Sequence, residues 1–226
     1  MSMYVSDDLY QKSHEACRKY IDDVCIWRSQ SGEKIPAKCP GHYYTWQFYL
    51  RRALFNTAFM NSFTNLFVYQ VEREVGHFNF QITGRETGAT PMISALTILC
   101  KAKYNIEING FSVRKKRKEY GLKNYIEGIV APNVPILIVD DLCNSAVSIS
   151  ECYKVLERLG YPLLDVVFTA VNKTNSFDVS KVENDKYFSE LGISDVTFLS
   201  PFNLDDFNLH IPIGDDRYMF EGDISE

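Results

Sequence analysis

The segment from residue 135 to residue 151 constrains the fold of this chain more than any other. It opens with Pro135-Ile-Leu-Ile-Val139, an almost purely apolar run that is typical of a parallel strand buried on both faces. Asp140 and Asp141 follow directly, and the chain then turns at once into the pattern of a helix start. Carboxylates are thereby placed beside the unpaired N–H groups of a helix. Such an edge suits a ligand that carries both hydroxyl groups and a phosphate.

Strand and helix patterns alternate through the rest of this region. Short apolar or alternating runs predict strands over residues 78–83, 108–113, 135–139, 165–171 and 196–199. Apolar residues three and four positions apart predict helices over residues 91–104, 149–159 and 180–191. This alternation predicts an α/β fold with a parallel sheet flanked by helices. Ligands in such sheets bind at the carboxyl ends of the strands.

The first 75 residues carry no such alternation. Their apolar spacing predicts a helix over residues 4–28, a loop rich in proline and glycine over 29–42, and further helix over 44–74 that is divided near residues 61–65. We therefore predict three regions: a helical N-terminal segment (1–75), an α/β core (76–200) and a C-terminal tail (201–226).

Composition narrows the class of partner. The 226 residues carry a net charge of −5 with a pI near 5.5, which gives no signal for non-specific nucleic-acid binding or an anionic membrane surface. We expect a small-molecule partner and a cytoplasmic protein, because the sequence shows neither a secretory signal nor a stretch of about 20 apolar residues. The six cysteines include His14-x-x-Cys17 and Cys39-x-x-His42, which are incomplete as zinc signatures. Reduced thiols are the favoured interpretation.

The acidic strand end allows two interpretations. Neighbouring side chains on a strand point to opposite faces, so Asp140 and Asp141 can line one pocket only if the chain leaves strand geometry at Asp141. Alternatively, both acids merely end the strand and cap the next helix. Residues 144–148 likewise form either a phosphate cradle at a helix start or a plain helix cap, because Ser148-Ile-Ser-Glu151 fits a capping box. The cradle and the cap can coexist.

Two further segments complete a candidate site. Gly84-Arg-Glu-Thr-Gly88-Ala-Thr-Pro91 is a glycine-bearing turn that allows close approach of backbone to ligand, or an ordinary strand-to-helix turn. From Arg114 to Asn124, six of eleven residues are cations, which form either a solvated loop or an anion-binding one. With the two acids, these segments suit a polyanion that bears phosphate and pyrophosphate, with magnesium between.

In this order, the three segments resemble the motifs of the type I phosphoribosyltransferases, most closely of the orotate phosphoribosyltransferase branch. Gly84-x-Glu-Thr-Gly-Ala-x-Pro91 is similar to the pyrophosphate loop, and Val113-Arg-Lys-x-x-Lys118-x-Tyr-Gly121 to the mobile catalytic loop. Val139-Asp-Asp141 with its turn is similar to the loop for phosphoribosyl pyrophosphate (PRPP). The resemblance spans roughly residues 78–172.

The resemblance implies a role for each matched position. Asp140 and Asp141 would hold the ribose hydroxyls of PRPP, with Asp141 also steadying charge near the reacting carbon. The 5′-phosphate would lie against Asn144, Ser145, Ala146, Val147 and Ser148. Pyrophosphate would be bound by Arg114, Lys115 and the mobile-loop lysine Lys118. The backbone of Glu86, Thr87 and Gly88 would line the side of the site that holds pyrophosphate and magnesium. The N-terminal segment would form a hood over the nucleobase.

The implied reaction is displacement of pyrophosphate from C1 of PRPP, or of a related 5′-phosphorylated nucleotide, by a base nitrogen. Lys118 and Asp141 would be catalytic, and Mg²⁺ would be carried by PRPP near Asp140 and Asp141 rather than by a dedicated metal site. A homodimer is implied, because one cation of the family's loop is donated across the dimer interface.

One departure from the family pattern supports a second hypothesis. Ala146 and Val147 stand where the family commonly has glycine and threonine, and an alanine held in the left-handed region costs about 1 kcal/mol or more. The alternative is a phosphoribosyltransferase-fold binding or effector subunit of a larger assembly, for example in bacterial defence, with altered, hydrolytic or lost turnover and a heteromeric protein partner.

Overall fold

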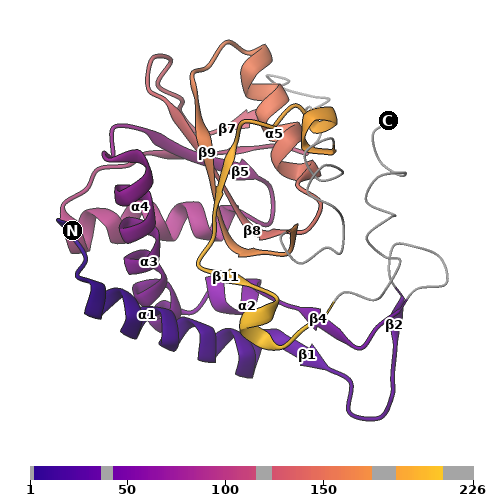
Figure 1. The fold of residues 1–226 in the computed structure, drawn as a ribbon. Helices are drawn as coiled ribbons and strands as arrows, with labels where there is room; N and C mark the ends of the chain where they lie inside the picture. The colour runs from indigo at the N-terminus through magenta and orange to yellow at the C-terminus, as the bar shows by residue number, and fades with distance from the viewer. Residues whose placement is uncertain (1–2, 37–42, 116–123, 175–186, 211–226) are drawn as a thin grey trace.

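The computed structural model describes residues 3–36, 43–115, 124–174 and 187–210. Its centre is a sheet of strands β5 (Gln81–Arg85), β6 (Gly110–Val113), β7 (Ile126–Glu127), β8 (Ile136–Cys143), β9 (Leu163–Asn172), β10 (Thr197–Leu199) and β11 (Phe202–Asn203). The strand order is β10-β9-β8-β5-β6-β7, with β11 also paired to β9 (Figure 1). The pairs are parallel apart from β6 with β7. The predicted α/β class and parallel sheet are confirmed.

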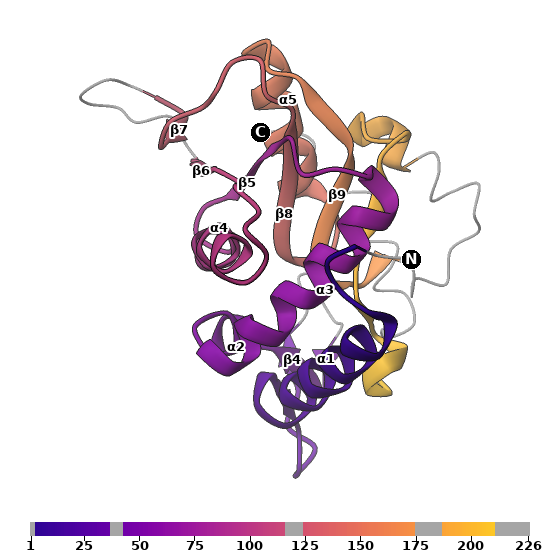
Figure 2. The same ribbon diagram turned by 90° about the vertical axis from the view of Figure 1, so that its left-hand side faces the viewer.

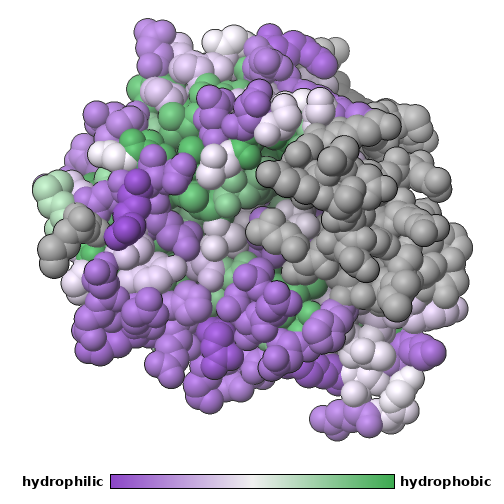
Figure 3. Space-filling model, in the orientation of Figure 1, coloured by the Kyte–Doolittle hydropathy of each residue, from purple (hydrophilic) through white to green (hydrophobic). Residues whose placement is uncertain are grey.

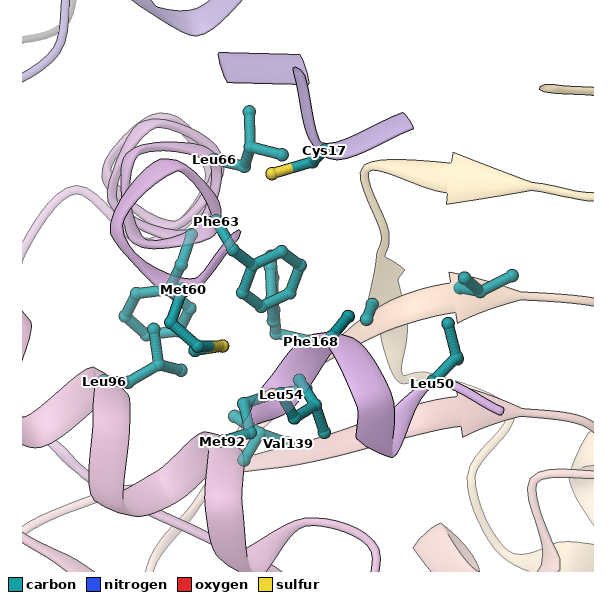
Figure 4. Packing of buried hydrophobic residues seen from close by; sticks show 14 of the residues in the cluster. Cys17, Leu50, Leu54, Met60, Phe63, Leu66, Met92, Leu96, Val139 and Phe168 are labelled. Carbon is teal, nitrogen blue, oxygen red and sulfur yellow. The ribbon is translucent and has the colours of Figure 1, made fainter. Parts of the chain in front are cut away.

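Helices cover both faces of this sheet. On one side, α1 (Asp7–Tyr20), α3 (Thr57–Val75) and α4 (Thr90–Tyr104) share a core with β5, β8 and β9, where Phe63 packs its ring 5.7 Å from that of Phe168 (Figure 4). On the other side, α5 (Val147–Arg158) packs Ile149 and Leu156 against Ile138 and its neighbours. Figure 2 shows β6 and β7 at one edge of the sheet. The carboxyl ends of β5, β6 and β8 are therefore adjacent, which positions the candidate site.

The N-terminal segment is less helical than predicted. The helix expected over residues 4–28 gives way after Tyr20 to a π-helical turn (Ile21–Cys25) and then to strand β1 (Ile26–Arg28). This strand pairs antiparallel with β4 (Trp46–Phe48), and the short β2 (Ile35–Pro36) pairs with β3 (Tyr43–Tyr44). The prediction of helix at residues 26–28 and 46–48 is wrong, because pairing between strands about 20 residues apart leaves no mark on local apolar spacing.

The break predicted near residues 61–65 is also wrong. It falls instead between α2 (Arg51–Leu54) and α3, where the Asn56 side chain accepts a hydrogen bond from the N–H of Phe59 at 2.9 Å and caps α3. Residues 61–65 lie inside α3. The buried Asn65 donates its side-chain amide to Ser13 Oγ at 2.7 Å, so this polar residue ties α3 to α1 rather than interrupting a helix.

Residues 201–210 bind the N-terminal segment to the rest of the chain. The indole N–H of Trp46 donates to the carbonyl of His210 at 3.0 Å, and Arg28 donates to the carbonyl of Phe207, which ends a 3₁₀ turn (Asp205–Phe207), at 3.2 Å. Of the helix predicted over residues 180–191, residues 187–191 are helical and the others lie outside the described residues. The predicted three-region division stays a prediction.

The outer face of α1 is hydrophilic (Figure 3) and includes the exposed pair of Lys12 with Asp8. No helix in the described part of the chain is long and apolar enough to cross a membrane. The five cysteines that the structure describes are free and buried, as predicted for reduced thiols, whereas Cys39 lies outside these residues. Nε2 of His14 lies 2.9 Å from the carbonyl oxygen of Pro201, so its environment is that of a packed side chain.

Candidate active site at the carboxyl edge of the sheet

The structure brings the pyrophosphate-loop segment against both acids. A side-chain carbon on Gly88 would lie 3.0 Å from Oδ1 of Asp141 and 3.5 Å from Oδ1 of Asp140. Glycine at this position therefore leaves open the space between the turn and the two carboxylates. Gly84 is equally constrained, because a Cβ there would lie 2.2 Å from the carbonyl oxygen of Val139. The Glu86–Thr87 peptide bond between these glycines is cis.

The two acids reach this position without leaving the strand. Strand β8 was predicted to end at residue 139, but it runs on to Cys143 and pairs Asp140 with Thr169 of β9. Each carboxylate instead accepts a hydrogen bond from the next backbone N–H: Asp140 from Asp141 at 2.9 Å, and Asp141 from Leu142 at 2.9 Å. The expectation that a shared pocket requires departure from strand geometry at Asp141 is therefore wrong. The carboxylates of Asp140 and Asp141 are instead oriented by these hydrogen bonds to the backbone of the following residue.

Arg85 is a charged group in this site to which the sequence analysis gave no role. It ends β5, forms an ion pair with Glu151 of α5, and donates to the carbonyl of Lys115 at 3.5 Å. Burial lowers the pKa of Arg85. Burial and then the charge of Asp141 raise the pKa of Asp140, and the charge of Arg85 opposes this shift. A cation directly after a glycine at a strand end was the available signal.

The start of α5 has no side-chain cap. Helix α5 begins at Val147, and Ala146 before it has φ 54° and ψ 2°, the left-handed conformation. The capping-box interpretation is wrong: Ser148 lies inside the helix, Glu151 pairs with Arg85, and no side chain caps the first turn. Ala146 is buried, and Ser148 is exposed. The N–H groups of this first turn are therefore left available to an anion, and the phosphate-binding role of residues 144–148 stays a prediction.

The cationic segment is only partly described. Nη1 of Arg114 lies 2.5 Å from Oε1 of Glu127 on β7, so the guanidinium is held at the sheet edge. Lys115 is exposed, and its N–H donates to Oε1 of Glu86 at 3.4 Å, which joins this segment to the pyrophosphate-loop turn. Lys118, predicted to be catalytic, lies with residues 116–123 outside the described residues. The roles of these cations stay predictions.

Lys173 is a second residue that sequence reasoning missed. It follows β9 at the same edge of the sheet and is only 6% exposed. Its Nζ lies 5.3 Å from the ring centre of Tyr44 and 5.2 Å from that of Trp46, both in the N-terminal segment, and no ion pair joins it to a described acid. Burial lowers its pKa to about 8. A lysine directly after a buried strand was the signal that could have found it.

Metal binding has no dedicated cluster here. Among the described residues, no group of three or more histidine, cysteine or acidic side chains could hold a metal ion. Asp140 and Asp141 supply hard carboxylate oxygens on one side of the open space at Gly88. Two such carboxylates fit a magnesium ion that also takes oxygens from a phosphorylated substrate.

Solved structures of phosphoribosyltransferases share this fold. Superposition gives a TM-score of 0.65 with a phosphoribosyltransferase from Corynebacterium diphtheriae (17% identity, covering 88% of this chain and 99% of that one). It gives 0.67 with the orotate phosphoribosyltransferase of Mycobacterium tuberculosis in complex with Fe(III) dicitrate (17% identity, 87% and 99%). The fold is therefore that of the type I phosphoribosyltransferases.

Sequence relatives narrow the similarity to one branch. The chain is 27% identical over 124 residues to the orotate phosphoribosyltransferase of Methanocaldococcus jannaschii, covering 55% of this chain and 64% of that one. It is 24% identical over 129 residues to that of Pyrococcus abyssi, covering 57% and 68%. The chain thus spans about two thirds of these relatives' length. No family model matches the chain. The resemblance to the orotate phosphoribosyltransferase branch is confirmed at the level of the family.

Proposed function

We propose that this protein is a phosphoribosyltransferase that transfers ribose 5-phosphate between PRPP and a nucleobase-like acceptor, with release of pyrophosphate. The observation that carries the proposal is the convergence of Asp140, Asp141 and the Gly88 turn beside the uncapped start of α5. In this proposal, the two acids bind the ribose of PRPP. The helix start binds its 5′-phosphate, and the Gly88 turn lies beside its pyrophosphate. Orotate phosphoribosyltransferases among the relatives support the same activity.

In this proposal, the chain acts by positioning and charge. Asp140 and Asp141 accept hydrogen bonds from the ribose hydroxyls, and Asp141 stabilises positive charge that develops near C1 as pyrophosphate leaves. The helix start fixes the 5′-phosphate, so that C1 is held in line between the acceptor nitrogen and the leaving group. When bound with PRPP, Mg²⁺ supplies charge neutralisation on the pyrophosphate. Lys118 adds positive charge there.

The acceptor side is formed by Lys173 under Tyr44 and Trp46. The aromatic side chains come from the predicted hood, and a buried cation without a described acidic partner suits an acceptor that carries an anionic or strongly hydrogen-bond-accepting group. This inference leaves the particular base open. The homodimer and the cytoplasmic location stay predictions.

A thermal-shift experiment tests the binding step. PRPP with Mg²⁺ is expected to raise the melting temperature, and the double variant Asp140→Asn/Asp141→Asn is expected to lose this shift. The double variant Asp22→Asn/Asp23→Asn removes two adjacent acids elsewhere on the chain and should keep it. Absence of any shift in the wild-type protein would overturn the proposal.

A pyrophosphate-release assay over a panel of bases tests turnover. The alternative of a binding or effector subunit is not favoured by the comparisons, which include orotate phosphoribosyltransferases and an adenine phosphoribosyl transferase. Release of pyrophosphate with one base supports transfer. PRPP binding without release over the whole panel, together with a stable partner protein, would favour the alternative.

A further inference from the structure

The segment that follows β9 contacts the phosphate-binding turn from outside the three motifs. The hydroxyl of Tyr187 donates a hydrogen bond to the carbonyl of Ser145 at 2.7 Å. Tyr187 is 2% exposed, and its ring packs in the same core as Ile149 and Cys143. Burial raises the pKa of Tyr187 to about 12, so the hydroxyl keeps its proton at neutral pH.

The bond acts on the peptide group that precedes Ala146. This peptide is held at its carbonyl by the hydroxyl of Tyr187. A peptide group is planar, so a hydrogen bond to its carbonyl also restricts the direction of its N–H. That orientation leads into the left-handed conformation of Ala146, which glycine adopts freely and alanine does not.

The conformation of Ala146 in turn decides where α5 starts. With φ at 54° the chain enters the helix directly at Val147, and the N–H groups of the first turn carry no side-chain cap. If Ala146 left the left-handed conformation, these N–H groups would move and would no longer point together at one phosphate. The turn has alanine rather than glycine at position 146, so its conformation depends on the contact with Tyr187, which lies outside the motif.

We propose that Tyr187 is a positioning residue: its hydroxyl holds the Ser145–Ala146 peptide and thereby fixes the start of α5 for the 5′-phosphate of the substrate. The proposal rests on the proposed function, because the phosphate belongs to PRPP. Tyr187 touches no substrate in this scheme. It acts through the backbone of the turn.

Tyr187→Phe tests the role, since it keeps the ring and removes only the hydroxyl. Isothermal titration with PRPP and Mg²⁺ is expected to show roughly three- to tenfold weaker binding than in the wild type, from loss of one hydrogen bond. In the ligand-free protein, amide hydrogen exchange at residues 145–149 is expected to be faster. Ser150→Ala is the matched control: it removes the neighbouring bond from Ser150 Oγ to the carbonyl of Leu191 (2.6 Å) and should leave PRPP affinity unchanged.

The double variant Tyr187→Phe/Ala146→Gly separates positioning from general weakening of the core. Glycine adopts the required conformation without support, so the double variant is expected to regain affinity close to that of the wild type. A double variant as weak as Tyr187→Phe would overturn the role, as would equal affinity and exchange in Tyr187→Phe and wild type. Wild-type protein that fails to bind PRPP would instead overturn the proposed function, and this inference with it.

Discussion

Replacing Lys173 with methionine is expected to stabilise the folded protein while it weakens acceptor binding. Burial lowers the Lys173 pKa from 10.5 to about 8. At neutral pH this shift corresponds to a loss of about 3 kcal/mol from the free energy of unfolding. The cation–π contacts of Lys173 with the rings of Tyr44 and Trp46 stabilise the folded protein by about 1 to 2 kcal/mol. The net gain of Lys173→Met at pH 7 is therefore about 1 to 2 kcal/mol, or roughly 2 to 8 °C in melting temperature.

The pH dependence gives this prediction its sign. Above pH 8 the folded protein releases the Lys173 proton, whereas the unfolded chain keeps it up to pH 10.5, so wild-type stability rises with pH through this window. By pH 9.5 about 2 kcal/mol of the penalty has gone, and the advantage of the variant should vanish. Urea unfolding at pH 7 and pH 9.5 measures both values, and exposed Lys12→Met should change stability by less than about 0.5 kcal/mol. A variant less stable than wild type at pH 7, or an advantage unchanged at pH 9.5, would refute the reasoning.

Four further changes test the site and its surroundings. Gly84→Ala is expected to cost about 1 to 3 kcal/mol in urea unfolding, because its Cβ would lie 2.2 Å from the Val139 carbonyl oxygen, and an unchanged midpoint would contradict this. Gly88→Ala should leave stability nearly unchanged but weaken PRPP binding tenfold or more in calorimetry, because its methyl group fills the space before Asp141 and Asp140; equal affinity would count against the site. Asp140→Asn should raise the melting temperature of the ligand-free protein at pH 7, because the folded state destabilises the ionised carboxyl whose pKa is raised; a lower melting temperature would contradict that direction. In a Cys39→Ser background, the native protein should react slowly with a thiol reagent at pH 8 and release five thiols on unfolding, since burial raises the pKa of Cys17, Cys100, Cys143 and Cys152 to about 12 and that of Cys25 to about 11.

The sheet could be predicted because its strands are short apolar runs with local signals. Pro91 marks the first turn of α4, and Gly160 follows α5 with φ 77°. The pairing of β1 with β4 could not be predicted, because it joins segments about 20 residues apart in the sequence. The same limit misplaced the break in α3, where a tertiary bond to Ser13 outweighs the local preference of Asn65.

The two acids that we propose hold the ribose were accessible to sequence reasoning, and much of their environment was not. Adjacent acids after an apolar strand are a local pattern, so Asp140 and Asp141 could be assigned as a pair. The route by which both reach Gly88 depends on hydrogen bonds to the following N–H groups, which no pattern encodes. Arg85 and Lys173 derive their importance from burial and from neighbours on other elements, which become visible only in the folded chain.

The turn that we propose binds phosphate shows why a departure from a motif is weak evidence for lost function. The sequence predicts a cost at Ala146 if the position is left-handed, and the structure places it at φ 54°. In the same structure the turn gains a hydrogen bond from Tyr187, about 40 residues further along the chain, and its helix start stays free of a side-chain cap. A hydrogen bond of this kind contributes about 0.5 to 1.5 kcal/mol, the same order as the cost of a left-handed alanine. Because the two terms offset each other, the motif alone overstates the loss, and the geometry of the turn is the better guide to whether phosphate binds.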